Sequence, residues 1–175
     1  MIYVLFGVVI VIAVLVIAMF IIFIITGVPF VSLSKKKIDK ILDFIEFDKT
    51  KTLYDLGCGD ARFLVRSYAK YGISGVGYEL NWWAILRFKL NIFIHRSDVV
   101  LFNKNFLKVN LASADYIFVY LIPSAMVQLE NKLLKEPKDF REVISYGFAF
   151  PNLKPSKVFY TESRRDRGRV YIYNL

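Results

Sequence analysis

The sequence is poor in cysteine and histidine, with one of each in 175 residues. The lone cysteine, Cys58, excludes an internal disulfide and is consistent with a reducing compartment. The single histidine, His95, falls at the end of an expected helix and away from strand ends, which favours a surface residue over a catalytic base. Internal repeats are absent, and the one low-complexity tract is an apolar run at the start of the chain. These absences exclude a disulfide framework and a repeat architecture.

Charged side chains are missing from the first 34 positions, and all 24 basic and 15 acidic residues follow them. The apolar run from Ile2 to Ile25 would span a ~30 Å hydrocarbon core as a helix rising ~1.5 Å per residue. A signal peptide would have a shorter apolar region after positive charge, and a buried core helix would stop sooner. We therefore expect a transmembrane anchor over residues 1–27 and a folded domain over residues 28–175.

The net charge of +9 belongs entirely to the part of the chain after residue 34. Lys35 to Lys37 follow the apolar run, which predicts a single-pass membrane protein with its folded domain on the cytoplasmic side. A second basic cluster runs from Arg164 to Arg169. Attraction to anionic lipid, worth ~1 kcal/mol per basic residue, explains these clusters at least as well as nucleic acid, and a solvated basic face explains them equally well. Because no aromatic and basic recognition motif is evident, we expect a membrane bilayer and no nucleic acid as partners.

After residue 34 the sequence alternates segments of strand and helix character. Apolar residues at helical spacing predict helices over residues 36–47, 60–72, 81–95 and 123–136. Alternating or continuous apolar runs predict strands over residues 51–57, 73–80, 98–104, 114–121, 141–150, 157–163 and 169–175. This order predicts an α/β fold, a Rossmann-like, doubly wound sheet of seven strands with an antiparallel carboxyl-terminal edge.

The helix expected over residues 81–95 is apolar nearly all round, which predicts burial on more than one side. Its two tryptophans and the basic residues Arg87 and Lys89 resemble an interfacial set. We therefore hypothesise that part of this helix, tested at Phe88 or Ile92, touches a membrane or a transmembrane helix of a substrate.

The stretch "LYDLGCGDAR" places Gly57 and Gly59 in the turn between the first predicted strand and the next helix. In open α/β sheets such a turn lets the backbone approach a ligand. A dinucleotide site would need a third glycine or an alanine where this sequence has Arg62. Asp55 before the turn and Asp60 at its end disfavour a pyrophosphate but suit a ligand that carries an amino group and a cationic sulfur.

The spacing D-x-G-x-G-x-A resembles motif I of the class I S-adenosylmethionine-dependent methyltransferases, with Ala61 where that superfamily commonly has glycine. The second predicted strand ends near Glu79, 20 residues past Gly59, where a carboxylate can accept hydrogen bonds from both ribose hydroxyls. The turn and Glu79 together therefore favour S-adenosylmethionine as the cofactor.

Several segments further narrow this resemblance, including "PFVSLSKKKIDKIL", "YDLGCGDAR", "GVGYELNWW" and "REVISYGFAFPNLKP". Over about residues 29–155 the chain resembles the small membrane-associated lysine methyltransferases related to those acting on the ATP synthase c-subunit and the adenine nucleotide translocase. The resemblance implies that Asp55, Gly57 and Gly59 hold the amino-acid end of the cofactor and that Glu79 holds its ribose. It also implies that the rest of the cofactor pocket includes Cys58, Asp60, Arg62, Asn105 and Phe106.

Four of these positions have a more specific interpretation. Asn105 stands where the family usually has an aspartate beside the adenine, so it keeps an acceptor oxygen and loses the charge. Asp60 and Arg62 match a "GDGR" segment of the family. Cys58 lies inside the turn, where a small packing residue is expected rather than a nucleophile.

The predicted reaction is methyl transfer to a lysine of a membrane or membrane-proximal protein, without a metal or a covalent enzyme intermediate. Tyr120, at the end of the fourth strand, could line the acceptor channel with its ring beside the ammonium or sulfonium. Two alternatives stay open, a methyltransferase acting on a lipid or small membrane molecule and a non-catalytic, cofactor-binding membrane scaffold.

Overall fold

The computed structural model describes residues 2–26, 32–95, 97–136, 141–162 and 168–175. The chain divides into two compact units, Met1–Val31 and Ser32–Leu175, which are described separately. The predicted boundary between residues 27 and 28, the arginines from Arg164 to Arg167 and the side chain of His95 lie outside the described residues.

The first unit contains one helix, α1 (Ile2–Thr26). Its described side chains are those of residues 6–21. A membrane span needs about 20 apolar residues, and within the described part of the chain no helix is long and apolar enough to cross a bilayer. This finding corrects the predicted transmembrane helix and, with it, the single-pass membrane localisation.

The second unit follows the predicted alternation of strands and helices. Its elements in chain order are α2 (Lys35–Phe44), β1 (Thr52–Leu56), α3 (Arg62–Tyr71), β2 (Ser74–Tyr78), α4 (Trp82–His95), β3 (Val99–Phe102), the 3-10 helix η1 (Phe106–Lys108), β4 (Tyr116–Val119), α5 (Pro123–Lys135), β5 (Glu142–Tyr146), β6 (Lys157–Tyr160) and β7 (Arg169–Asn174).

The strands form one seven-stranded sheet in the order β3-β2-β1-β4-β5-β7-β6. The first five strands are parallel, and β7 pairs antiparallel with both β5 and β6. The predicted doubly wound sheet with an antiparallel carboxyl-terminal edge is therefore confirmed. The parallel register aligns the last paired residues of neighbouring strands, Leu56 with Tyr78 and Val119, and Tyr78 with Phe102. We call this side of the sheet the carboxyl edge.

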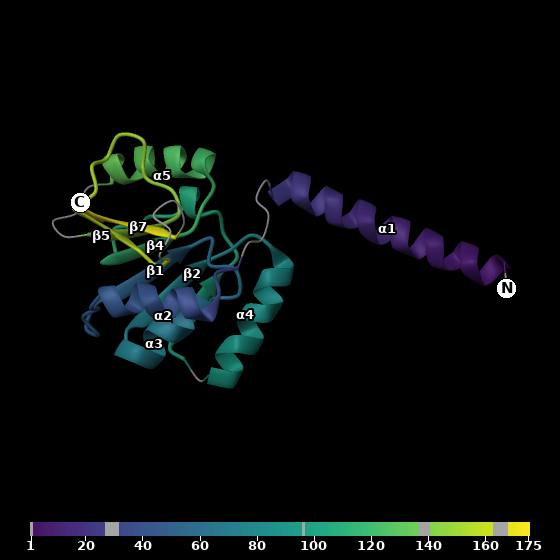
Figure 1. Cartoon of the computed structure of the whole chain (residues 1–175), viewed down its shortest axis with the longest axis horizontal. Coiled ribbons are helices and arrows are strands. Elements are labelled where there is room, and N and C mark those ends of the chain that lie inside the picture. Colours follow the sequence, from purple (N-terminus) through teal and green to yellow (C-terminus); the bar gives the residue numbers. More distant parts are fainter. Residues whose placement is uncertain (1, 27–31, 96, 137–140, 163–167) are drawn as a thin grey trace. The chain divides into compact units, whose positions relative to one another are not determined.

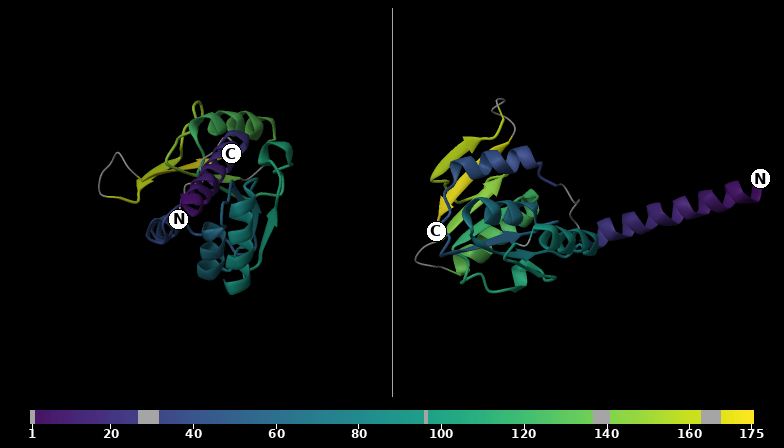
Figure 2. Two further views of the ribbon diagram at one scale, coloured as in Figure 1. Left: turned by 90° about the vertical axis from the view of Figure 1, so that its right-hand side faces the viewer. Right: turned by 90° about the horizontal axis from the view of Figure 1, so that it is seen from below.

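Helices cover both faces of the sheet, as Figure 1 and the two views in Figure 2 show, with α5 on one side and α3 and α4 on the other. Each face has its own core because each helix presents an apolar stripe to the strands. One cluster includes Ile38 and Ile41 of α2 with Phe63 of α3, and the other includes Met126 and Leu129 of α5.

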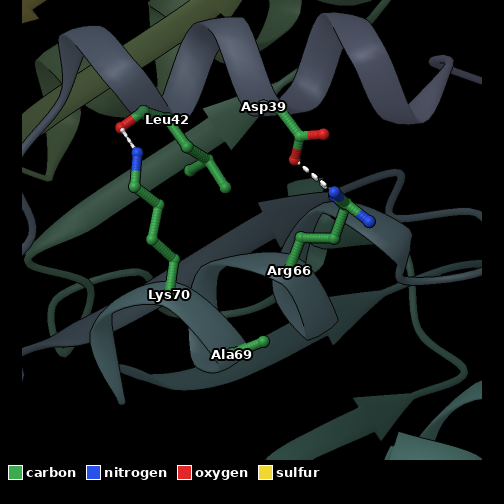
Figure 3. Close-up of a pocket in the computed structure, with 5 residues that line it drawn as sticks. All are labelled: Asp39, Leu42, Arg66, Ala69 and Lys70. Atoms are coloured by element: carbon green, nitrogen blue, oxygen red, sulfur yellow. Dashed lines mark hydrogen bonds and ion pairs between the residues drawn. The ribbon is translucent and has the colours of Figure 1, made fainter.

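Charged pairs connect α2 to α3 on the outer surface of the first cluster. Arg66 binds Asp39, and the Lys70 ammonium donates a hydrogen bond to the Leu42 carbonyl oxygen at 2.8 Å (Figure 3). These side chains, with Ala69, line a shallow groove between the two helices. The groove lies along the helices and does not include the glycine turn, so it is not the predicted cofactor site.

Helix α4 buries one face, and the opposite face is exposed. Phe88 is 1% exposed, and Ile92 packs against the same core cluster. The two positions chosen to test contact with a membrane or a substrate helix therefore face the core, because α4 packs on α3 and β3. Among the side chains of this helix that the structure describes, the exposed apolar ones are Trp82, Trp83, Leu86, Leu90 and Phe93.

Gly77 of β2 provides the space that the Cys58 side chain occupies. A Cβ atom at position 77 would lie 2.6 Å from the Cys58 Sγ atom and 3.1 Å from Phe88 Cε2. We expect Gly77→Ala to lower the free energy of unfolding by about 1–3 kcal/mol in urea titrations, because overpacking displaces well-packed neighbours.

Two further variants make that prediction specific. Gly75→Ala is a matched control in the same strand, since its Cβ would meet the end of the flexible Leu64 side chain at 3.0 Å and should cost less. Adding Cys58→Ala to Gly77→Ala should recover part of the loss. Equal losses at positions 75 and 77, with no recovery, would show that Cys58 does not occupy this space.

Candidate functional site

The turn after β1 is connected to the end of β2 by backbone hydrogen bonds. The N–H groups of Gly57 and Cys58 both donate to the Tyr78 carbonyl oxygen, at 2.9 and 3.1 Å. Gly57 has φ +80° and Gly59 has φ +56°, both in the left-handed region that glycine adopts without a Cβ clash. A Cβ at Gly57 would also approach Leu121 Cδ2 to 3.0 Å. The backbone thus favours glycine at these two positions, as the sequence pattern indicates.

Ala61 has a left-handed backbone, with φ +58° and ψ +16°, at the start of α3. Its N–H donates to the Cys58 carbonyl oxygen at 2.9 Å, and its own carbonyl accepts the first helical bond, from Val65. A non-glycine residue in this conformation is strained by roughly 1–2 kcal/mol. Glycine would adopt this geometry without strain, and Ala61 adopts it with its side chain fully buried.

The Glu79 carboxylate joins the glycine turn to the segment after β2. Its Oε2 atom accepts a hydrogen bond from the Gly59 N–H at 2.9 Å. Its Oε1 atom accepts from the N–H groups of Leu80 and Asn81, at 2.8 and 2.7 Å. A carboxylate has about four acceptor positions, so Glu79 can hold the turn and still accept a hydrogen bond from a ligand.

Two further carboxylates lie close to Glu79. Asp55 is 3% exposed at the end of β1, and its pKa is raised well above the ordinary value by burial and then by the charges of Glu79 and Asp60. Asp60 is 5% exposed and pairs with the Arg62 guanidinium, with Nε to Oδ1 at 2.8 Å and Nη2 to Oδ2 at 2.5 Å. The site therefore gathers negative charge around a glycine turn.

Cys58 is buried inside the turn. Burial, and then the charges of Asp55 and Glu79, raise the pKa of its thiol well above the ordinary value. A thiol that stays protonated is a poor nucleophile. Its side chain fills the space that a Cβ atom at position 77 would need, which supports the packing role predicted from the sequence.

Asn105, the predicted adenine residue, and Phe106, another predicted pocket residue, follow β3 at the carboxyl edge. The Asn105 side chain caps the short helix η1, because its Oδ1 atom accepts a hydrogen bond from the Leu107 N–H at 2.9 Å. Phe106 is partly buried and packs against the core cluster beneath α5. Both residues have structural roles, and their contact with the cofactor stays a prediction.

Tyr120 directly follows β4 at the same edge. Its ring meets the Tyr146 ring edge-on, with centroids 5.0 Å apart and planes at 87°. Burial and then the neighbouring Tyr146 raise the pKa of the Tyr120 hydroxyl, and the Lys37 charge partly opposes them. Tyr120 therefore belongs to an aromatic pair, of which the sequence analysis identified one member.

Three residues that position the turn were missed. The Asn91 side chain donates to the Asp60 carbonyl at 2.7 Å, and the Asn103 side chain donates to the Glu79 carbonyl at 2.8 Å. The Leu33 carbonyl accepts a hydrogen bond from Arg62 at 3.0 Å. An amide side chain among the apolar and basic residues of α4 was a usable signal for Asn91, whereas a backbone carbonyl leaves no signal in the sequence.

These groups fit a cationic nucleoside ligand such as S-adenosylmethionine. Buried and neighbouring carboxylates favour positive charge, a glycine turn admits close backbone approach, and a strand-terminal glutamate can accept ribose hydroxyls. Among the described residues, no group of three or more His, Cys, Asp or Glu side chains could hold a metal ion. The metal-free reaction stays a prediction.

Comparison with known sequences identifies a family. The family model for the ANTKMT methyltransferase domain matches residues 55–157 of this chain. A protein-lysine N-methyltransferase of Saccharolobus islandicus is 27% identical over 151 residues, which are 83% of this chain and 92% of that protein. The ATP synthase c-subunit lysine N-methyltransferase of Homo sapiens is 31% identical over 133 residues, and the match covers 74% of this chain. This chain spans 56% of the length of that human relative.

Comparison with solved structures gives a consistent result. An RNA methyltransferase of Salinibacter ruber, solved in complex with S-adenosyl-L-homocysteine, has a TM-score of 0.75 and 25% sequence identity. The similarity covers 82% of this chain and 93% of that one.

These comparisons confirm the predicted enzyme class, an S-adenosylmethionine-dependent methyltransferase, and its cofactor. The family model begins at Asp55, the first residue of the candidate site, and covers more than half of the chain. The chain therefore belongs to the family of ANTKMT methyltransferase domains.

Proposed function

We propose that this protein transfers a methyl group from S-adenosylmethionine to the ε-amino group of a lysine in another protein. The observation that carries this proposal is the glycine turn held by Glu79, since it provides a cofactor site at the start of the region matched by the family model. The names of the relatives, a protein-lysine and an ATP synthase c-subunit lysine N-methyltransferase, support lysine as the acceptor.

The proposed roles of the site residues follow from their chemistry. Asp55 would pair with the positive charge of the cofactor, and Glu79 would accept a hydrogen bond from a ribose hydroxyl while it holds Gly59. The Asp60–Arg62 pair would keep the turn in place. The remaining positions proposed to line the pocket are Gly57, Cys58, Asn105 and Phe106.

When bound, the cofactor supplies a methyl group on a sulfonium. The lysine nitrogen forms the new bond to the methyl carbon with its lone pair, the carbon–sulfur bond breaks, and its electron pair stays on the sulfur. The lysine must therefore lose its proton to solvent first, although its unperturbed pKa is ~10.4. Tyr120 would line the acceptor channel, where aromatic side chains exclude water and align the amine.

RNA is a second candidate acceptor. The similarity to the Salinibacter ruber RNA methyltransferase, together with the net charge of +9, favours a test of this acceptor. A lipid or small molecule, and a non-catalytic role in cofactor binding, are further outcomes that the same experiment separates.

The first prediction concerns the acceptor. Purified full-length protein is incubated with S-adenosylmethionine carrying a labelled methyl group and a cell extract separated into protein, RNA and lipid. We expect label in protein, recovered as methyllysine after acid hydrolysis. Label only in RNA or only in lipid would overturn lysine as the acceptor. Cofactor binding without any transfer would overturn catalysis.

Glu79→Gln tests the site in the same assay. The amide has one acceptor oxygen instead of two, so we expect cofactor affinity to fall about tenfold or more by calorimetry. Glu46→Gln is the matched control, because it removes the same charge from an exposed carboxylate before β1. An equal effect of the two substitutions would show that Glu79 has no special role in cofactor binding.

A further prediction concerns Asp55. Because its folded-state pKa is raised, the carboxyl group favours the folded state when protonated, and this stability is lost as the pH rises above the unfolded-state value of about 4. Asp55→Asn should therefore make the cofactor-free protein more stable at pH 7, by several degrees in melting temperature, and this advantage should shrink toward pH 4.

The same substitution should weaken cofactor binding, because the carboxylate would no longer pair with a cation. Asp98→Asn is the control, an exposed carboxylate that accepts a hydrogen bond from the Ser74 hydroxyl at 2.8 Å. It should not stabilise the protein at pH 7. If Asp55→Asn is stabilising and leaves cofactor affinity unchanged, Asp55 does not contact the cofactor's charge.

A further inference from the structure

The Lys37 ammonium lies near one aromatic ring and a carboxylate, and that ring packs against Tyr120, the residue predicted to line the acceptor channel. The Lys37 Nζ atom is 2.7 Å from Glu162 Oε1 and 5.9 Å from the centroid of the Tyr146 ring. The Tyr146 ring in turn packs edge-on against Tyr120. We call Tyr120, Tyr146 and Glu162 the amine subsite, and Lys37 is its occupant in this structure.

The amine subsite stands at the carboxyl edge of the sheet, where the glycine turn also lies. Tyr120 and Tyr146 follow Val119 and Ser145, which are register partners in β4 and β5. Glu162 lies two residues past the end of β6, a strand that runs in the same direction as β5. Lys37 is in the first turn of α2, just after Leu33, whose carbonyl accepts a hydrogen bond from Arg62 of the turn region.

We propose that the amine subsite receives the ε-ammonium of the acceptor lysine and that Lys37 occupies it until the acceptor displaces it. This inference rests on the proposed function and adds the residues that recognise the acceptor. The ligand is a primary ammonium on a flexible alkyl chain, as in the lysine that fills the subsite now. A ring face and a carboxylate both attract such a cation.

The charge state of Lys37 agrees with this role. Its hydrogen bond to Glu162 raises the pKa of Lys37, burial opposes that rise, and Tyr146 adds to it. The subsite therefore stabilises an ammonium, which suits the docking of a lysine before its proton leaves. The side chains of Lys37 and Glu162 are 38% and 33% exposed, so a lysine from another protein has access.

The chain contains a second cluster of a lysine, a carboxylate and a tyrosine, which lies away from the carboxyl edge. The Lys70 ammonium is 2.7 Å from Asp43 Oδ1 and 5.2 Å from the centroid of the Tyr71 ring. Lys70 lies at the end of α3, just before β2 begins, and so at the opposite edge of the sheet from the glycine turn. Figure 3 shows its side chain extended toward α2. A lysine, a carboxylate and a tyrosine thus also occur together away from the site, which provides an internal control.

The test uses poly-L-lysine as the acceptor and the full chain loaded with S-adenosylhomocysteine. Lys37→Ala should lower the apparent dissociation constant about 3–10-fold, because the competing side chain is removed. Lys70→Ala removes the same charge and should change it less than about twofold. Calorimetry measures both variants at one ionic strength, so general repulsion between the protein and the polymer cancels in the comparison.

The subsite itself is tested by Tyr146→Leu and Tyr146→Phe. Leucine should weaken binding about 3–10-fold, whereas phenylalanine keeps the ring and should bind nearly as well as the unaltered protein. Glu162→Gln tests the same subsite if Tyr146→Leu does not fold. Cofactor affinity should stay within about twofold in all of these variants.

The outcomes separate this inference from the proposed function. Equal effects of Lys37→Ala and Lys70→Ala, or unchanged binding by both Tyr146→Leu and Glu162→Gln, would overturn the amine subsite even if methyllysine is formed. The expected binding changes without any transfer of labelled methyl groups to poly-L-lysine or to protein would keep a lysine-binding subsite and overturn the proposed function.

Discussion

The hydrogen bonds accepted by the Glu79 carboxylate are the contacts on which the rest of the site depends. β1 and β2 are parallel neighbours, so the chain must pass through α3 before it reaches Glu79, and no short loop connects the two strand ends. Glu79 joins them directly through the Gly59 N–H, while the Tyr78 carbonyl accepts from Gly57 and Cys58. The residues at the end of β2 thereby hold the glycine turn that follows β1.

Features that oppose stability are concentrated at this same turn. Ala61 adopts a left-handed backbone, and Asp55 is buried beside two other carboxylates. Arg62 and Asn91 offset part of this by binding Asp60, through its side chain and its carbonyl respectively. Strain and unfavourable charge commonly gather where a protein binds a ligand, because the ligand then supplies the missing interactions. A cationic cofactor among these carboxylates would do so.

Several differences between the predicted and observed elements have local causes. The helix predicted over residues 60–72 begins at Arg62, because Ala61 turns the chain in the left-handed conformation. The helix predicted over residues 36–47 ends at Phe44, because Ile45 is extended and reaches the core from there. Apolar residues all round α4 predicted burial on several sides, but packing against α3 and β3 buries one face and leaves both tryptophans exposed.

The sequence alone determined the order of the elements, the antiparallel edge, the glycine turn and the position of Glu79, 20 residues after that turn. These follow from apolar periodicity and from short spacings, which are local properties of the chain. Only the tertiary structure decided that Lys37 meets Glu162 and Tyr146, that Leu33 binds Arg62, and that Asn91 anchors the turn. Such contacts join residues far apart in sequence, and they depend on the order of the strands in the sheet, which no local pattern records.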